Sequence, residues 1–344
     1  MQSRTDWVDY AKAIGIILVV YGHVARGLFN AGISIPENAY TLADSIVYSF
    51  HMPLFFFLSG LFFYSSFTKK GGVKLTFNKV DTIIYPYLIW SILQGSVEVA
   101  LSNYTNGNVT FIEVFSLWEP RAHFWFLYAL FLVFIVSSII FTVVSEKRAS
   151  LVLAGSCVLY LASSLSVEVK LFPFITNNLV FFSLGIVFTR YNASKKLSSN
   201  AALLITMISF ILAQFLFHGY LGKLYENKGV DTLLLAIISI FFIVSLSIAM
   251  AKSPNRLFAY VGASSMAIYL MHILVGSGAR IILSKVLSVD SAITHLVIGC
   301  FTGVLLPLLA LTIINKLKIP FVFSALISKY LTPLTRKSLN IKPD

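Results

Sequence analysis

Long apolar stretches recur along the whole chain and are separated by short polar loops. Each stretch holds roughly 20 residues, the length that an α-helix needs to cross the hydrocarbon core of a bilayer. Hydrocarbon cannot hydrogen-bond the backbone, so such stretches form helices. The pattern predicts about ten transmembrane helices, at residues 8–28, 43–66, 80–101, 122–143, 150–167, 174–190, 201–219, 230–250, 257–277 and 292–315.

The composition supports this assignment and excludes an ordinary soluble domain. Hydrophobic residues make up 58% of the chain and charged residues 12%, and the mean hydropathy is +0.85. Soluble domains carry about 25% charged residues. We therefore predict an all-α, polytopic integral membrane protein. The first apolar run leads into GLFNAG without a clear cleavage site, so we expect a retained span rather than a removed signal peptide.

The basic residues are distributed unevenly between the loops. The net charge is +12, and nineteen of the 26 lysines and arginines fall on one side when ten spans are threaded from an inside N-terminus. Cytoplasmic loops are rich in Lys and Arg, so this bias predicts that both termini are cytoplasmic. It also accounts for the basic charge without a nucleic-acid partner.

Two regions follow from this topology. Residues 1–318 form the predicted transmembrane domain, and residues 319–344 form a basic cytoplasmic tail. In this tail the stretch FVFSALISKYL, after Pro320, is too short for a span and has basic neighbours. We expect it to form a helix that lies at the inner surface of the membrane.

The first span carries several titratable side chains at helical spacing. Lys12 and His23 are 11 residues apart, so they lie about 20° apart on a helix and roughly 16 Å apart along its axis. Asp9 precedes Lys12 by three residues and can pair with it, which lowers the cost of keeping both charges near the inner boundary. Arg26 continues the same stripe outward.

Two interpretations of this stripe stay open. Lys12 is as readily explained by snorkelling to the membrane surface as by function, because charged residues near helix ends commonly do so. His23 lies within the span, where an ionisable residue is a functional candidate by default. A histidine can take a proton from a hydroxyl that attacks a carbonyl and return it to the leaving group. Arg26 could then bind an anionic intermediate.

These residues also carry a resemblance to a known family. Asp9 and Lys12, followed by ten residues and His23, resemble the first-helix signature of the membrane acyltransferase-3 family. WVDYAKAIGIILVVYGH is most similar to the branch of fucose 4-O-acetylases and polysaccharide O-acetyltransferases. Later family motifs are matched in order by FHMPLFFFLSGLFF, IIYPYLIW, HFWFLYAL and ASSMAIYLMH.

The resemblance implies an enzyme of the bacterial inner membrane that modifies polysaccharides. It would transfer an acetyl group from cytoplasmic acetyl-CoA, without a metal, to a hydroxyl of an extracytoplasmic or lipid-linked glycan such as O-antigen, capsule or exopolysaccharide. His23 would be the general base or would itself carry the acyl group. Lys12, with Asp9, would orient the donor, and Arg26 would lie at the outer end of the site.

The other motif residues are candidates for substrate contacts. His51, His123 and His272 lie in matched motifs and would surround an acceptor pocket, although a structural hydrogen-bonding role is as good an explanation for each. Trp125 could stack on a sugar face, and the alternative is the aromatic belt at a membrane interface.

The donor site is the least complete part of the resemblance. Lys74 and Lys79 lie in the basic loop that would contact the phosphates of CoA. Many relatives have an Arg-x-x-Arg pair just before the proline of the third span, but Val80 and Ile83 stand at that spacing from Pro86.

Two other classes of function remain as alternatives. A multi-pass transporter or flippase for a lipid-linked sugar or acyl group would also need many spans and buried charge, although we find no internal repeat of the kind that many transporters contain. A regulatory protein with a degenerate acyltransferase fold is the other. If the protein is an enzyme, the acceptor could also be peptidoglycan, a lipid headgroup or a small molecule.

Overall fold

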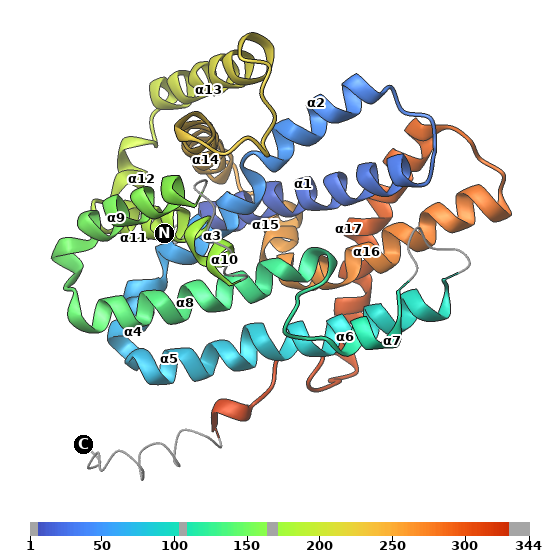
Figure 1. The fold of residues 1–344 in the computed structure, drawn as a ribbon, viewed down its shortest axis with the longest axis horizontal. Helices are drawn as coiled ribbons and strands as arrows, with labels where there is room; N and C mark the ends of the chain where they lie inside the picture. The colour runs from blue at the N-terminus through green and yellow to red at the C-terminus, as the bar shows by residue number, and fades with distance from the viewer. Residues whose placement is uncertain (1–5, 103–108, 164–170, 330–344) are drawn as a thin grey trace. The chain divides into compact units, whose positions relative to one another are not determined.

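The computed structural model describes residues 6–102, 109–163 and 171–329, and every regular element in these ranges is helical (Figure 1). The first nine α-helices are α1 (Asp6–Asn30), α2 (Glu37–Tyr48), α3 (His51–Leu61), α4 (Phe63–Lys70), α5 (Gly72–Lys79), α6 (Tyr85–Ala100), α7 (Phe111–Phe115), α8 (Trp125–Val143) and α9 (Ala149–Ala162). The remaining eight are α10 (Phe172–Thr176), α11 (Leu179–Arg190), α12 (Ala193–Lys196), α13 (Asn200–Gln214), α14 (Val230–Ala251), α15 (Arg256–Ala263), α16 (Ser265–Ile281) and α17 (Ala292–Lys316). Short π-helical turns (Val80–Ile84, Phe215–Tyr220, Ile282–Val286) and 3₁₀ turns (Ala122–Phe124, Glu146–Arg148) join several of them.

Nine helical segments in the described ranges are long and apolar enough to cross a membrane, which confirms the predicted all-α, multi-pass fold class. The tenth predicted span, residues 150–167, falls on α9. This helix has 14 residues and extends about 21 Å at 1.5 Å per residue, which is less than the roughly 30 Å of a hydrocarbon core. Residues 164–170, which complete that predicted span, lie outside the described residues.

One predicted span has a different start in the structure. The apolar pattern predicts a helix over residues 257–277, but the chain turns at Ser264, and the segment long enough to span begins at Ser265. The preceding residues form α15, whose Gly262 lies directly against α1. Hydropathy alone cannot separate the two helices because both are apolar.

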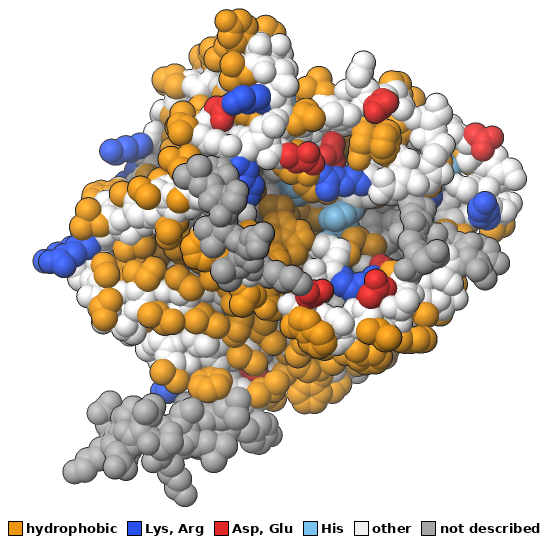
Figure 2. All heavy atoms as spheres, viewed as in Figure 1, with side chains coloured by type: hydrophobic (Ala, Val, Ile, Leu, Met, Phe, Trp, Pro, Cys, Tyr) orange, Lys and Arg blue, Asp and Glu red, His pale blue; other side chains and the backbone are white. Residues whose placement is uncertain are grey.

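The surface of the molecule fits a lipid environment. Hydrophobic side chains cover much of the face shown in Figure 2, and charged side chains are few there. In the spanning segment Asn200–Tyr220, only 11% of the most apolar 18-residue stretch is buried inside the protein. Its outward side chains include Ile205, which is 63% exposed, and Phe215, which is 66% exposed. Such apolar surface is stable against lipid chains.

The chain divides into two compact units. One, the first unit, contains the residues up to Leu58 and residues 188–318; the other, the second unit, contains residues 59–102, 107–187 and those from Ile319 onward. In the first unit α1 is the central helix and packs against α14, α15, α16 and α17. The side chains of Ala11, Ala13 and Ile16 are fully buried in this packing.

Glycines let the neighbouring helices approach α1 closely. A Cβ on Gly262 of α15 would lie 1.7 Å from the carbonyl oxygen of Asp9, so only glycine fits there. Gly299 and Gly303 of α17 are four residues apart and face α1, where an added Cβ would lie 2.8 Å and 2.7 Å from valine methyl groups. Small residues at this spacing are typical of close helix packing in membranes. They hold α1 in a defined position.

The second unit has an aromatic core. The ring of Phe63 lies within 6.0 Å of the rings of Phe134 and Phe182, centroid to centroid. The end of α3, just before Phe63, approaches α11 closely, because a Cβ on Gly60 would lie 2.0 Å from the carbonyl oxygen of Phe182. In this unit α5 packs against α8, and α6 packs against α7 (Figure 1).

The described part of the C-terminal segment differs from its prediction. Residues 321–326, the first half of FVFSALISKYL, form a turn, bends and irregular chain rather than a helix. The indole of Trp90 donates to the carbonyl of Val322 over 2.9 Å, and the backbone N–H of Ala325 donates to the carbonyl of Asp81. The Asp81 side chain, 4% exposed, accepts from the backbone N–H of Ser328. These partners hold the backbone in a non-helical path, and a helix pattern in the sequence does not reveal them.

Candidate functional site

Three of the predicted site histidines come together in the first unit. The rings of His23 on α1 and His272 on α16 lie 5.1 Å apart, centroid to centroid. Tyr48, the last residue of α2, meets the ring of His51 edge-on at 4.4 Å and the ring of His23 at 6.5 Å. We call these four residues the histidine cluster. It joins α1, α2 and α3 to α16, which begins more than 200 residues later in the sequence.

The histidines differ in exposure. His51 and His272 are each 1% exposed, whereas His23 is partly exposed. The Nδ1 atom of His51 lies 2.8 Å from the carbonyl of Val47, and Nδ1 of His272 lies 2.7 Å from the carbonyl of Tyr269. A carbonyl only accepts, so both Nδ1 atoms carry the proton and donate. These bonds fix the orientation of the two buried rings beside the ring of His23.

Arg26 lies about one turn after His23 on α1 and is held by several partners. Its Nε and Nη2 donate to the two carboxylate oxygens of Asp44 over 2.7 Å and 2.8 Å, a bidentate pair. Nη2 also donates to the hydroxyl of Tyr225 over 2.9 Å. The guanidinium group stacks on the ring of Tyr48, with its central carbon 3.4 Å from the centroid. Arg26 therefore ties α1 to α2 and to the loop before α14.

That loop, residues 221–229, is fastened to the same place. The backbone N–H of Tyr225 donates to the hydroxyl of Ser45 over 2.8 Å. Burial raises the pKa of the Tyr225 phenol above its usual value, although the hydrogen bond from Arg26 acts in the opposite direction. The phenol is thus neutral at physiological pH. Lys223 of the loop pairs with Asp231 at the start of α14, which fixes the base of the loop.

The N-terminal end of α1 carries the predicted pair. Lys12 Nζ lies 3.2 Å from Asp9 Oδ1, and the two side chains are 34% and 39% exposed. This geometry confirms the predicted contact. Nearby, the backbone N–H of Asn255 donates to the hydroxyl of Tyr10, which packs α1 against the start of α15. Asp9 and Lys12 are thus held near one end of α1, three turns from His23.

His123 and Trp125 belong to the second unit. His123 is 2% exposed and lies 4.1 Å from the ring of Phe124. It follows Ala122, whose φ of +45° is uncommon for a residue other than glycine. Trp125 is the first residue of α8 and is partly exposed. The sequence motif HFWFL therefore falls on a strained turn that leads into a spanning helix.

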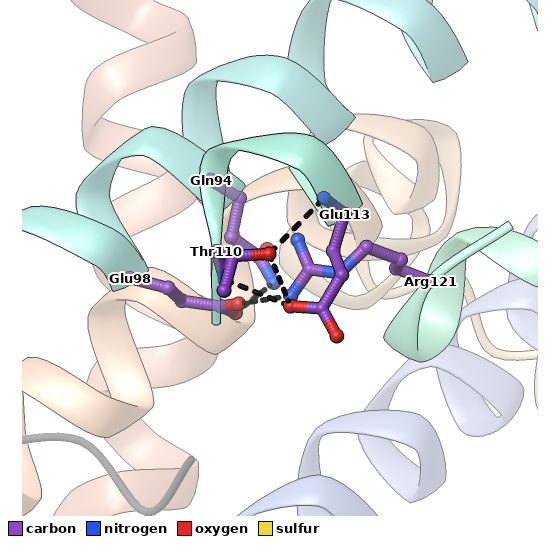
Figure 3. A network of polar contacts seen from close by, with 5 residues as sticks. All are labelled: Gln94, Glu98, Thr110, Glu113 and Arg121. Atoms are coloured by element: carbon purple, nitrogen blue, oxygen red, sulfur yellow. Dashed lines mark hydrogen bonds and ion pairs between the residues drawn. The ribbon is translucent and has the colours of Figure 1, made fainter. Parts of the chain in front are cut away.

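A polar network lies just before that turn (Figure 3). Arg121 donates to Glu98 of α6 over 2.7 Å, and Gln94 donates to the other carboxylate oxygen of Glu98 over 3.0 Å. Gly95 makes room for this arrangement, because a Cβ there would lie 2.8 Å from Nη1 of Arg121. On α7 the Glu113 carboxylate accepts from the backbone and hydroxyl of Thr110 (Figure 3), and these bonds lower the pKa of Glu113.

The predicted donor residues also lie in the second unit. Lys74 is exposed on α5, so it is available to an anionic group. Lys79 ends the same helix, and its ammonium group lies 4.2 Å from the ring centroid of Phe134. Lys70 donates to the side chain of Asn78 over 3.1 Å. Basic side chains thus lie along α5 and at the end of α4.

Three residues around Arg26 are not among the site residues predicted from the sequence. Asp44 and Tyr48 are four residues apart on α2, and both side chains contact Arg26. A carboxylate inside the second predicted span was an available signal for Asp44, because such a group needs a partner. Tyr225 lies in a loop, and its sequence surroundings carry no comparable signal.

The family of the chain follows from a comparison with known sequences. The profile of the acyltransferase-3 family, described as an acyltransferase domain, matches residues 5–312. The chain belongs to the acyltransferase-3 family. The match covers both units, including α1 with His23, α16 with His272 and the HFWFL motif. The predicted family is thereby confirmed.

Two curated relatives are similar to parts of the chain. A nodulation protein, NolL, of Mesorhizobium japonicum is 24% identical over 188 residues, which cover 53% of this chain and 47% of the relative. NolL of Sinorhizobium fredii is 26% identical over 193 residues, covering 55% of this chain and 50% of the relative. The chain thus spans about half the length of the curated relatives it matches. No solved structure matches the chain.

Proposed function

We propose that this protein is a membrane-bound O-acyltransferase. It moves an acetyl group from cytoplasmic acetyl-CoA to a hydroxyl of an extracytoplasmic or lipid-linked glycan in the bacterial inner membrane. The observation that carries the proposal is the partly exposed ring of His23 beside the buried His272, inside the spanning helices of a chain that belongs to the acyltransferase-3 family. An intramembrane histidine with oriented neighbours suits proton transfer.

In this proposal His23 is the general base. One of its ring nitrogens takes the proton of the acceptor hydroxyl while the hydroxyl oxygen attacks the acyl carbon. The alternative, in which His23 itself carries the acyl group, uses the same nitrogen as a nucleophile. His272 and His51 keep their rings in place through Nδ1–H bonds to backbone carbonyls and shape the apolar wall behind the reacting groups.

The remaining predicted residues have separate roles in the proposed reaction. The Asp9–Lys12 pair orients the donor at the inner end of α1, and Lys74 and Lys79 attract the phosphates of CoA. His123 and Trp125 bind the acceptor sugar in the second unit. Arg26 has its Nε and Nη2 occupied by Asp44 and Tyr225, which supports a positioning role for Arg26 in addition to its predicted contact with substrate.

The test measures O-acetylation of surface glycan. A strain lacking the gene is complemented with the wild type, with His23→Ala or with His295→Gln, a buried histidine outside the histidine cluster. Polysaccharide is purified from each strain, and acetyl signals are measured by proton NMR. We expect the wild type and His295→Gln to restore the signal and His23→Ala to lose it, at equal protein levels in the membrane.

Three other outcomes would revise or contradict the proposal. Equal restoration by His23→Ala would remove His23 from the chemistry while leaving the acyltransferase assignment intact. Absence of the glycan itself from the deletion strain, with restoration by every variant, would favour a flippase for a lipid-linked sugar. An acetyl signal that does not depend on the gene would contradict the proposed function.

A further inference from the structure

Tyr48 is the one member of the histidine cluster that lies outside the matched family motifs. It ends α2, where the chain turns into α3. Four charged or titratable side chains lie around its ring. Arg26 stacks on one face, and the rings of His51, Tyr225 and His23 lie 4.4 Å, 5.5 Å and 6.5 Å away, centroid to centroid. The ring is therefore held in one orientation by its neighbours.

The backbone of α1 is shaped to receive this phenol. A Cβ on Gly22 would lie 2.8 Å from Cε2 and 3.2 Å from the hydroxyl oxygen of Tyr48. Any side chain at position 22 would push the phenol away. Because Gly22 immediately precedes His23, its missing side chain brings the Tyr48 hydroxyl against α1 beside the proposed base.

The Tyr48 hydroxyl makes no hydrogen bond within the described part of the chain. Its oxygen is buried. Burying a hydroxyl without a partner costs roughly 1–3 kcal/mol, and a phenylalanine would fill the same space without that cost. A hydroxyl kept under these conditions is explained by a partner that arrives with the substrate.

We propose that the Tyr48 hydroxyl is a catalytic hydrogen-bond donor to the carbonyl oxygen of the transferred acyl group. This inference rests on the proposed acyltransferase function and adds a residue to it. The arrangement has the features of an oxyanion site: the donor is held rigidly, it is removed from water, and it lies beside the base. Arg26, stacked on the same ring and neutralised by Asp44, positions the phenol.

The reaction step balances as follows. His23 accepts the proton of the acceptor hydroxyl, and the hydroxyl oxygen forms a bond to the thioester carbon. The π electrons of the C=O bond move to its oxygen, where the Tyr48 O–H donates a hydrogen bond to the developing negative charge. The oxyanion then re-forms the C=O bond, the C–S bond breaks, and the departing sulfur takes the proton from His23. An acetyl ester and free CoA result.

The experiment separates the hydroxyl from the ring. Inner-membrane vesicles are prepared from the deletion strain carrying the wild type, Tyr48→Phe or Tyr21→Phe. The initial rate of incorporation of the acetyl group of radiolabelled acetyl-CoA into the endogenous acceptor is measured over a range of acetyl-CoA concentrations. Phenylalanine at position 48 keeps the ring contacts to Arg26 and the histidines. Tyr21 lies on α1 outside the histidine cluster. The variant Tyr21→Phe is the matched control, because it also removes one phenol hydroxyl.

We expect Tyr48→Phe to lower kcat about 100- to 1,000-fold, the usual loss for one oxyanion donor. The KM for acetyl-CoA should stay within about twofold, because the hydrogen bond forms with developing charge and not with bound substrate. Tyr21→Phe should keep the wild-type rate, and all three proteins should elute alike in size-exclusion chromatography after solubilisation.

Several results would overturn the proposal. They are an unchanged kcat in Tyr48→Phe, a raised KM at constant kcat, and an equal loss of rate in Tyr21→Phe. Failure of the underlying function gives a different result, because the wild-type vesicles would then incorporate no label above those of the deletion strain. The two failures are therefore distinguishable in the same experiment.

Discussion

At the scale of single residues, the ion pair of Arg26 and Asp44 has a large desolvation cost, because both charges lie in segments long and apolar enough to span a membrane. Removing two charges from water is costly, and only good geometry repays that cost. The pair is bidentate, the Asp44 side chain is 11% exposed, and Arg26 has further contacts with Tyr225 and Tyr48. Its retention in an apolar region indicates that the position of Arg26 matters to the protein.

Asp44→Asn should therefore destabilise the protein by about 2–3 kcal/mol. This is less than the roughly 3–5 kcal/mol lost from a fully buried pair, because the Arg26 side chain is 31% exposed. The midpoint of thermal unfolding in detergent measures the effect. Asp290→Asn removes an exposed carboxylate and should change stability by less than about 0.5 kcal/mol. Equal midpoints for both variants would show that the pair contributes nothing.

At the scale of elements, the arrangement of helices depends on contacts that only glycine permits. Gly262 lets α15 touch the backbone of α1, and Gly60 lets the end of α3 touch the backbone of α11. Through the first contact the short helix α15 holds the N-terminal end of α1, where Asp9 and Lys12 lie. The pair Gly299 and Gly303 sets the approach of α17 to the same helix. The position of His23 is thus decided by residues far from it in sequence.

Gly262→Ala should destabilise the protein by more than about 3 kcal/mol, because the added methyl group overlaps a backbone oxygen that no rotamer change can move. Gly278→Ala is the matched control: it lies on α16, and nothing approaches its added Cβ within 4 Å. Since alanine is the better helix former by up to about 1 kcal/mol, the control should keep or raise the midpoint of thermal unfolding. A mild effect of Gly262→Ala would mean that α15 does not pack on α1 in the membrane.

At the scale of the whole molecule, the topology depends on a single short helix. Nine spanning segments in the described ranges would place the two termini on opposite sides of the membrane, and ten would place them on the same side. The difference lies at α9. The distribution of Lys and Arg predicts ten crossings with both termini in the cytoplasm. The loop after α11, with Arg190, Lys195 and Lys196, distinguishes the two topologies. It lies on the cytoplasmic side if α9 crosses the membrane and on the opposite side if α9 does not cross.

Labelling of single cysteines tests this topology. In a variant lacking Cys157 and Cys300, Tyr191→Cys should react with a membrane-impermeant maleimide only after the cells are permeabilised, because its loop is predicted to be cytoplasmic. Ser34→Cys lies in the predicted outer loop after α1 and should react in intact cells. Both positions are exposed. Reaction of Tyr191→Cys in intact cells would mean that α9 does not cross.

Much of the fold could be predicted from the sequence because lipid imposes a simple rule. A backbone in hydrocarbon must form helices, so apolar length alone indicates where most spans lie. The rule fails where apolar residues continue through a turn, as at Ser264 between α15 and α16. It also fails where distant partners determine the backbone, as at residues 321–326, which are held by Trp90 and Asp81.

The sequence by itself determined the class of the protein, its family and the alignment of Asp9, Lys12 and His23 on one helix, because hydropathy and helical periodicity are properties of neighbouring residues. Only the tertiary structure brought His272 to His23, and only it placed Asp44, Tyr48 and Tyr225 around Arg26. The physical reason is that these contacts join helices up to about 250 residues apart in sequence. Their geometry depends on glycines that allow close packing and on buried charges that need partners, and neither requirement leaves a periodic signal in the chain.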